Sequence, residues 1–358
     1  MKKIFFAIMA TAALASCSQD EVMNVNQEAI GFGEAFVDNA ARAIDPSYSN
    51  TTNKITKFNV WGTLKGNTNQ IVKLYQGAEV YSTKDGDTQA YGEAWWCDQV
   101  EYWVPNATYV FAAVANHTSV TADSGLPETI TFDYTNGATD LLYTQNPNTV
   151  KTDIAATPTT GVNDNKIVNF TFNHLLSKLQ FKFINKAASE KHIFRVKDIK
   201  ISGLPTSGTY TIGGTWSTSG TNGVASFGDA TNATTASSTT AVDILTTNTV
   251  GITSNDARLV IPNSNTLTIT FVKELYYDAD GDKVADTNEL IYTDANKTTN
   301  DKYTTITLNG TGVADKDKTK FEVNGNYVLI AELISGSEIN FTVNSVANWA
   351  DGVDVKVN

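Results

Sequence analysis

The alternation of apolar and polar residues at a period of two most strongly limits what this chain can fold into. Residues 167–172 read Ile-Val-Asn-Phe-Thr-Phe, and residues 179–183 read Leu-Gln-Phe-Lys-Phe. Successive strand residues point to opposite faces of a sheet, so this pattern is typical of half-buried strands. Similar segments rich in Thr, Val, Ile, Tyr and Phe recur along the chain between Asn, Gly, Asp and Ser residues. Helical periodicity is scarce, and the pattern predicts an all-β protein.

The first residues have the features of a lipoprotein signal peptide. Lys2 and Lys3 precede an apolar run of only eleven residues, Ile4 to Leu14. A membrane-spanning helix needs ~20 such residues, so residues 1–16 are predicted to be a signal peptide. The box Leu-Ala-Ser-Cys then ends at Cys17, whose thiol is predicted to carry the lipid of an outer-membrane lipoprotein. An ordinary secretory signal with an incidental cysteine is the alternative.

The charge and the cysteine content limit the partners and the source of stability. The formal net charge is −12, which argues against nucleic acid or anionic lipid as a partner. If Cys17 carries lipid, Cys97 has no intramolecular disulfide partner. Its neighbours Trp95 and Trp96 indicate a buried thiol, so stability is expected to come from packing.

Three segments suggest a first strand that is removed and a last strand that could replace it. Residues 30–37 are predicted to form a strand, and Arg42–Ala43 follows in a context of small residues. Residues 353–358 alternate without a fault and place Val353, Val355 and Val357 on one face. Residues 146–164 are polar, with prolines and a glycine. We therefore expect a tether and removable strand over residues 17–42, one sandwich over 43–164 and a second over 165–358.

Five motifs in this order resemble those of the fimbrillins, the type V pilin family of Bacteroidetes. They are the Leu14–Cys17 box, Ile30-Gly31-Phe32 ahead of Arg42-Ala43, Tyr102-Trp103-Val104-Pro105, Phe172-Asn173-His174-Leu175-Leu176-Ser177-Lys178-Leu179, and Ala347-Asn348-Trp349-Ala350-Asp351-Gly352. The resemblance implies two transthyretin-like, Greek-key β-sandwich domains in tandem and export as a lipoprotein. It also implies cleavage by a trypsin-like protease after an arginine, matched here by Arg42, and then polymerisation by strand exchange.

Elementary energetics support such an exchange. Withdrawing an inward-facing strand exposes an apolar groove and unpaired sheet edges. Burying about three large apolar side chains contributes ~1.5–3 kcal/mol each, whereas a whole domain is stable by only ~5–15 kcal/mol. A strand from another subunit can fill the groove by β-augmentation, and Val353, Val355 and Val357 are the predicted donor residues. Such a contact does not close on itself and generates a filament. Alternatively, this segment is an ordinary last strand of its own domain.

An acidic loop is a candidate calcium site. Residues 278–289 place Asp278, Asp280, Asp282, Asp286 and Glu289 at positions 1, 3, 5, 9 and 12 of twelve, which is the spacing of a calcium loop. Lys283 replaces the glycine of position 6, and the flanking segments are predicted strands. A solvated acidic turn is the alternative.

No enzymatic signature is present, and we expect neither activity nor a required cofactor. The histidines His117, His174 and His192 have no metal-site spacing, and His174 is expected to be structural.

The sequence therefore predicts a structural subunit of a cell-surface fimbria that supports adhesion. The expected partners are other pilin subunits, a trypsin-like protease, the outer membrane before processing, and a ligand on a host or bacterial surface. A fimbrial anchor or tip accessory protein is one alternative. A surface glycan-binding lipoprotein that stacks sugars on Trp95, Trp96 and Trp103 is another, although these residues could instead belong to a sandwich core.

Overall fold

The structure of this chain is a computed structural model, which describes most of the residues that form the sheets. The described residues are 29–37, 55, 57–66, 68, 70–81, 95–104, 107–134, 139–151, 167–227, 230–231, 243–245, 252–254, 257–263, 266–294, 304–308, 321–334 and 339–346. They form strands joined by turns, with one 3-10 helix, η2 (Thr287–Glu289), and no α-helix. The all-β prediction is confirmed. Within these residues, no helix is long and apolar enough to span a membrane.

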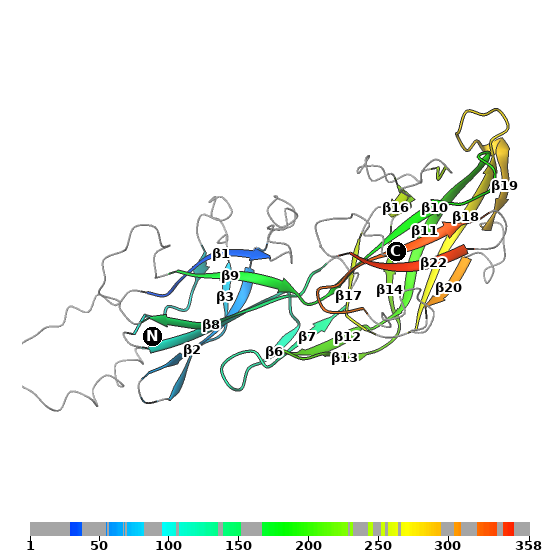
Figure 1. Cartoon of the computed structure of the whole chain (residues 1–358). Helices are drawn as coiled ribbons and strands as arrows, with labels where there is room; N and C mark the ends of the chain where they lie inside the picture. The colour runs from blue at the N-terminus through cyan, green and yellow to red at the C-terminus, as the bar shows by residue number, and fades with distance from the viewer. Residues whose placement is uncertain are drawn as a thin grey trace, which may run out of the picture.

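A seven-stranded sheet forms the N-terminal part of the molecule (Figure 1). Its order is β1-β9-β8-β5-β2-β3-β4. The bounds are β1 (Gly31–Val37), β2 (Lys57–Lys65), β3 (Ile71–Tyr81), β4 (Trp96–Cys97), β5 (Ala107–Ala115), β8 (Leu142–Lys151) and β9 (Ile167–His174). The central strand β5 is buried on both faces. Ala113 and Ala115 face one apolar cluster, and Ala112 and Val114 face another.

A four-stranded sheet joins the two halves of the chain. It has the order β13-β12-β7-β6, with β6 (Ser119–Thr121), β7 (Thr129–Asp133), β12 (Ser207–Thr211) and β13 (Trp216–Ser219). The strands β7 and β12 pair along five residues, from Thr129↔Thr211 to Asp133↔Ser207. Figure 1 shows this sheet between the N-terminal sheet and the C-terminal strands. Apolar residues from both halves, among them Trp61, Ile130 and Tyr210, pack together here.

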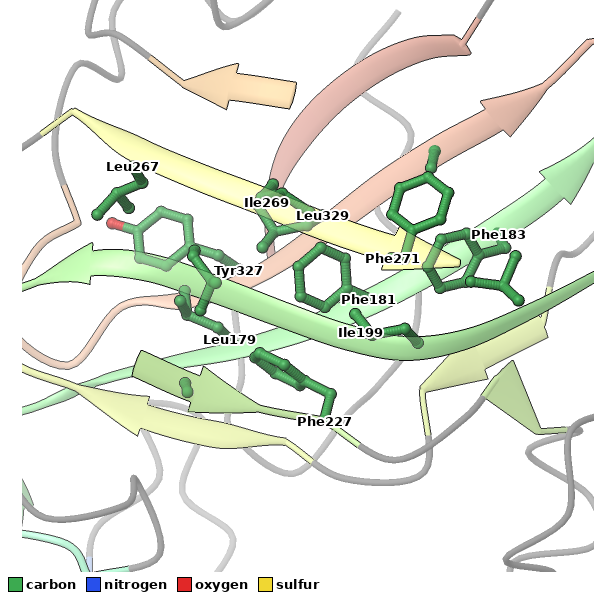
Figure 2. Packing of buried hydrophobic residues seen from close by; sticks show 14 of the residues in the cluster. Leu179, Phe181, Phe183, Ile199, Phe227, Leu267, Ile269, Phe271, Tyr327 and Leu329 are labelled. Atoms are coloured by element: carbon green, nitrogen blue, oxygen red, sulfur yellow. The ribbon is translucent and has the colours of Figure 1, made fainter. Parts of the chain in front are cut away.

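The C-terminal part is a sandwich of two sheets. One has the order β15-β16-β10-β21-β22, with β17 paired to β10, and the other has the order β14-β11-β18-β19, with β20 paired to β18. The bounds are β10 (Ser177–Asn185), β11 (His192–Leu204), β14 (Gly223–Ser226), β15 (Ala230–Thr231), β16 (Ile252–Ser254), β17 (Arg258–Val260), β18 (Leu267–Tyr277), β19 (Leu290–Thr293), β20 (Thr304–Leu308), β21 (Asn326–Leu333) and β22 (Ile339–Val346). Figure 2 shows Phe181, Phe183 and Phe271 meeting between the sheets.

The sheet order corrects the predicted boundary between residues 164 and 165. Strand β9 pairs with β8 and β1, so residues 167–174 belong to the N-terminal sheet. The chain leaves that sheet between His174 and Ser177, where β10 begins in the other sandwich. Residues 146–151 of the polar stretch extend β8, and alternation indicates a strand but not the sheet to which it belongs.

Candidate functional site

Strand β1 lies at the edge of the N-terminal sheet, where it pairs in parallel with β9. Gly31 is opposite Ile167 and Phe32 is opposite Val168, after which the register shifts before Ala35 meets Phe170. The shift places Glu34 in a β-bulge, where the strict alternation of a strand is interrupted. Residues 30–37 therefore form a strand, as predicted, but one with an interrupted register.

The first strand contributes directly to the apolar interior. Phe32 is 6% exposed. Its ring centroid lies 5.3 Å from that of Tyr75, 6.4 Å from that of Phe111 and 6.1 Å from that of Phe170. These three partners come from β3, β5 and β9. The prediction that this segment fills a hydrophobic interior is confirmed for Phe32 and for Ile30, which is also buried.

The same segment touches the other end of the sheet. Ala29 forms an antiparallel bridge with Tyr102, and the Ile30 amide donates a hydrogen bond of 2.8 Å to the Glu101 carbonyl. Residues 101 and 102 follow β4, the opposite end of the strand order. Residues 29–37 therefore pair with β9 at one end of the strand order and with residues 101–102 beyond the other end. Their removal would leave both of these backbone edges unpaired. Nothing in the sequence of residues 101–102 signals this backbone contact.

Gly33 permits the close approach of β1 and β9. A Cβ atom at this position would lie 2.1 Å from Asn169 Oδ1 and 2.4 Å from Ile167 Cγ2. Only glycine leaves that space to the neighbouring strand. Two residues of β1 therefore suit it to its position beside β9: Gly33 leaves room for the neighbouring strand, and Phe32 packs against Phe170.

Several predicted site residues lie outside the part of the chain that the structure describes. They are Cys17, Arg42, Ala43, Val353, Val355 and Val357. Their lipidation, cleavage and donor roles therefore stay predictions.

The three tryptophans of the alternative glycan platform do not share one surface. Trp103 is 3% exposed and packs its ring at 4.7 Å from that of Tyr109. Trp95 is partly buried against Phe58, with ring centroids 5.2 Å apart, and only Trp96 is exposed. A platform formed by all three is therefore wrong, because the interior needs Trp103. The core interpretation holds for Trp95 and Trp103.

Cys97 lies beside the same core and is partly buried. Burial raises the pKa of its thiol, so the thiolate, which is the nucleophilic form, is disfavoured. The prediction of a buried thiol is confirmed in part, because Cys97 packs against the core but is only partly buried.

His174 has a structural role at the change between the two parts. It is fully buried, and its Nδ1 atom lies 2.5 Å from Oδ2 of Asp140, which is 4% exposed. Asp140 precedes β8 and His174 ends β9. The contact therefore connects the start of β8 with the end of β9, where the chain leaves the N-terminal sheet.

The acidic loop connects β18 to β19. Carboxylate oxygens of Asp278, Asp280 and Asp282 lie within 4.8 Å of one another. Asp286 is exposed, whereas Glu289, at the end of η2, is buried. The structure thus brings together the first three of the five predicted ligands.

The comparisons with known proteins agree with this architecture. The model of a family described as fimbrillin-like matches residues 42–357, and a prokaryotic membrane lipoprotein lipid attachment site matches residues 1–18. The chain belongs to the fimbrillin-like family. It is a membrane-anchored lipoprotein of a cell-surface fimbria.

The chain is also similar to solved structures of fimbrial proteins. A fimbrial protein from Bacteroides vulgatus is 13% identical, with a TM-score of 0.55, and the match covers 90% of this chain and 99% of that one. The tip fimbrial protein of Porphyromonas gingivalis is 12% identical, with a TM-score of 0.42 and coverage of 88% and 99%. At 13% identity, the likeness to the Bacteroides vulgatus protein concerns the fold alone. No curated protein matches the sequence.

Proposed function

We propose that this chain is a fimbrial subunit that polymerises by strand exchange after cleavage behind Arg42. The single observation that carries the proposal is the position of β1, whose residue Phe32 fills the interior between β3, β5 and β9. Cleavage after Arg42 would separate β1 from the rest of the chain. The family match begins at residue 42 and so excludes β1.

A protease specific for arginine would find few sites in this protein. The sequence contains three arginines, Arg42, Arg195 and Arg258. Arg195 lies in β11 and forms a 2.5 Å ion pair with Asp243. Arg258 lies in β17, and its Nε donates to the Ser226 carbonyl. Paired strands resist proteolysis, and this favours Arg42 as the site of cleavage by a trypsin-like protease.

The vacated groove then needs a replacement strand. Burial of Ile30 and Phe32 contributes about 1.5–3 kcal/mol for each side chain, and loss of β1 forfeits that contribution. In our proposal Val353, Val355 and Val357 of a neighbouring subunit restore it by strand addition. Repetition of this heterologous contact produces a filament. Such a filament would serve adhesion to a host or bacterial surface, a structural role without enzymatic activity.

Cleavage and assembly can be tested together. The lipid-free chain is incubated with an arginine-specific endoprotease, followed by N-terminal sequencing and electron microscopy. We expect a new N-terminus at Ala43 and filaments that lengthen with time. The variant Arg42→Ala should stay intact and monomeric. The matched control Lys57→Ala, at an exposed basic residue of β2, should be processed and assembled like the parent.

Two results would contradict the proposal. An intact Arg42–Ala43 bond would refute the processing step. Cut protein that stays monomeric would refute self-assembly and favour an anchor or tip accessory role. Replacing Val353, Val355 and Val357 by Asp should block lengthening without blocking cleavage, which separates the donor role from processing.

A further inference from the structure

The loop of residues 278–289 gathers negative charge at one end of the C-terminal sandwich. Oxygens of Asp278, Asp280 and Asp282 lie within 4.8 Å of one another. Asp278 is only 3% exposed, and its carboxylate accepts hydrogen bonds from the amides of Gly281, at 2.6 Å, and Lys283, at 3.2 Å. Like charges at this spacing repel one another, more strongly where water is excluded.

A separate observation concerns Glu289, which closes the loop from the other side. Glu289 is 8% exposed. Its Oε1 accepts a 2.6 Å hydrogen bond from the amide of Ala279, the residue between Asp278 and Asp280 in the sequence, and this contact ties the carboxylate to the backbone of the loop. The second oxygen, Oε2, is buried without a hydrogen-bond partner among the described residues. A buried carboxylate oxygen without a partner is costly, and a cation in the loop would satisfy it.

We propose that residues 278–289 bind one calcium ion, with Asp278, Asp280, Asp282, Asp286 and Glu289 as ligands. All five supply hard oxygen atoms, and their positions 1, 3, 5, 9 and 12 match a calcium loop. A glutamate at the last position can offer both oxygens, which suits the larger coordination number of calcium over the strict octahedron of magnesium.

The departure at position 6 does not prevent this geometry. Lys283 has a φ of 62°, in the left-handed region that glycine normally occupies in such a loop. The lysine therefore adopts the turn that the spacing requires.

Ala285, in the middle of the loop, is held by contacts with β11, β18 and Asp243. The Ala285 amide donates a 2.8 Å hydrogen bond to Asp243 Oδ2, and Arg195 donates to the Ala285 carbonyl at 3.3 Å. Ala285 also packs with Ile193 and Tyr276. Binding therefore starts from a loop that is already fixed on one side, which lowers its entropic cost.

Isothermal titration calorimetry of the metal-stripped full chain with CaCl2 tests the proposal. We expect saturable heat for one site and a melting temperature that rises with calcium. Absence of saturable heat up to about 10 mM calcium, beyond the weakest extracellular calcium loops, would overturn the site. Equal affinity for magnesium would overturn the assignment to calcium.

Variants locate the site within the chain. The exposed pair Asp280→Asn and Asp282→Asn, combined, should weaken binding about 100-fold or more, because two of five charges are lost. Lys283→Gly should bind at least as tightly as the parent, since it keeps the turn and removes no ligand. Asp123→Asn, at an exposed acid of the N-terminal part, is the matched control and should bind like the parent. Unchanged binding by the double variant would show that the ion lies elsewhere and refute the proposal.

Discussion

Phe32→Ala is the most direct perturbation of the interior that β1 completes. The side chain is 6% exposed and contacts the rings of Tyr75, Phe111 and Phe170. Truncating a buried phenylalanine to alanine costs about 3–5 kcal/mol. Since a domain is stable by only ~5–15 kcal/mol, this change should remove a large share of the stability of the N-terminal part.

Urea unfolding followed by tryptophan fluorescence measures this cost. The experiment compares the full chain with a chain cut after Arg42 and freed of the released fragment. Phe32→Ala should lower the free energy of unfolding of the full chain by about 3–5 kcal/mol. It should leave the cut chain unchanged, because that chain no longer contains residue 32.

Phe227→Ala is the matched control in the other core. Phe227 is also 6% exposed, and its ring packs 4.7 Å from that of Phe181. This variant should destabilise the full and the cut chain alike. If Phe32→Ala lowers the free energy of unfolding of the full chain by less than about 1 kcal/mol, the side chain does not support the interior, and removal of β1 would leave no apolar groove to fill.

Three further variants test other contacts. Asp140→Ala removes one partner of the buried pair with His174 and should destabilise the chain by about 3–5 kcal/mol in urea unfolding; a loss below about 1 kcal/mol would refute the pair's role. Burial lowers the pKa of His117 below its usual 6.5, so the unfolded chain binds protons more readily and stability falls as the pH drops through that value. In His117→Gln, the melting temperature should fall less as the pH is lowered. If the melting temperature depends on pH as in the parent, His117 is not the group responsible for the loss of stability. Gly33→Val should weaken the full chain by roughly 1–3 kcal/mol but not the cut chain. Gly66→Val, where a Cβ meets open space, is its control, and an equal effect of both would argue against close strand contact.

Local patterns predicted the strands, including the segment of residues 30–37 that carries the buried Phe32, and the acidic loop of residues 278–289. These features depend on residues that are close together in the sequence. Period-two alternation, for example, indicates a strand directly. Carboxylate oxygens of Asp278, Asp280 and Asp282 lie within 4.8 Å of one another because a tight turn brings residues two apart close together.

Sheet membership could not be predicted in the same way. The pairing of β12 with β7, and of β9 with β1 and β8, joins segments far apart in the sequence. Alternation gives a strand its two faces but not its neighbours. His174 and Asp140, which form a buried contact, are likewise separated by 34 positions, and neither residue type indicates its partner.

The shared sheet of β6, β7, β12 and β13 determines how a subunit would respond to tension. Besides the peptide segment between His174 and Ser177 and the apolar cluster that includes Trp61, Ile130 and Tyr210, a ladder of five residue pairs between β7 and β12 joins the two parts. A pull directed along those strands would load the hydrogen bonds together, as in shear, instead of breaking them one after another. Under a load in that direction, all five pairs would have to give way before the two parts could separate at this joint.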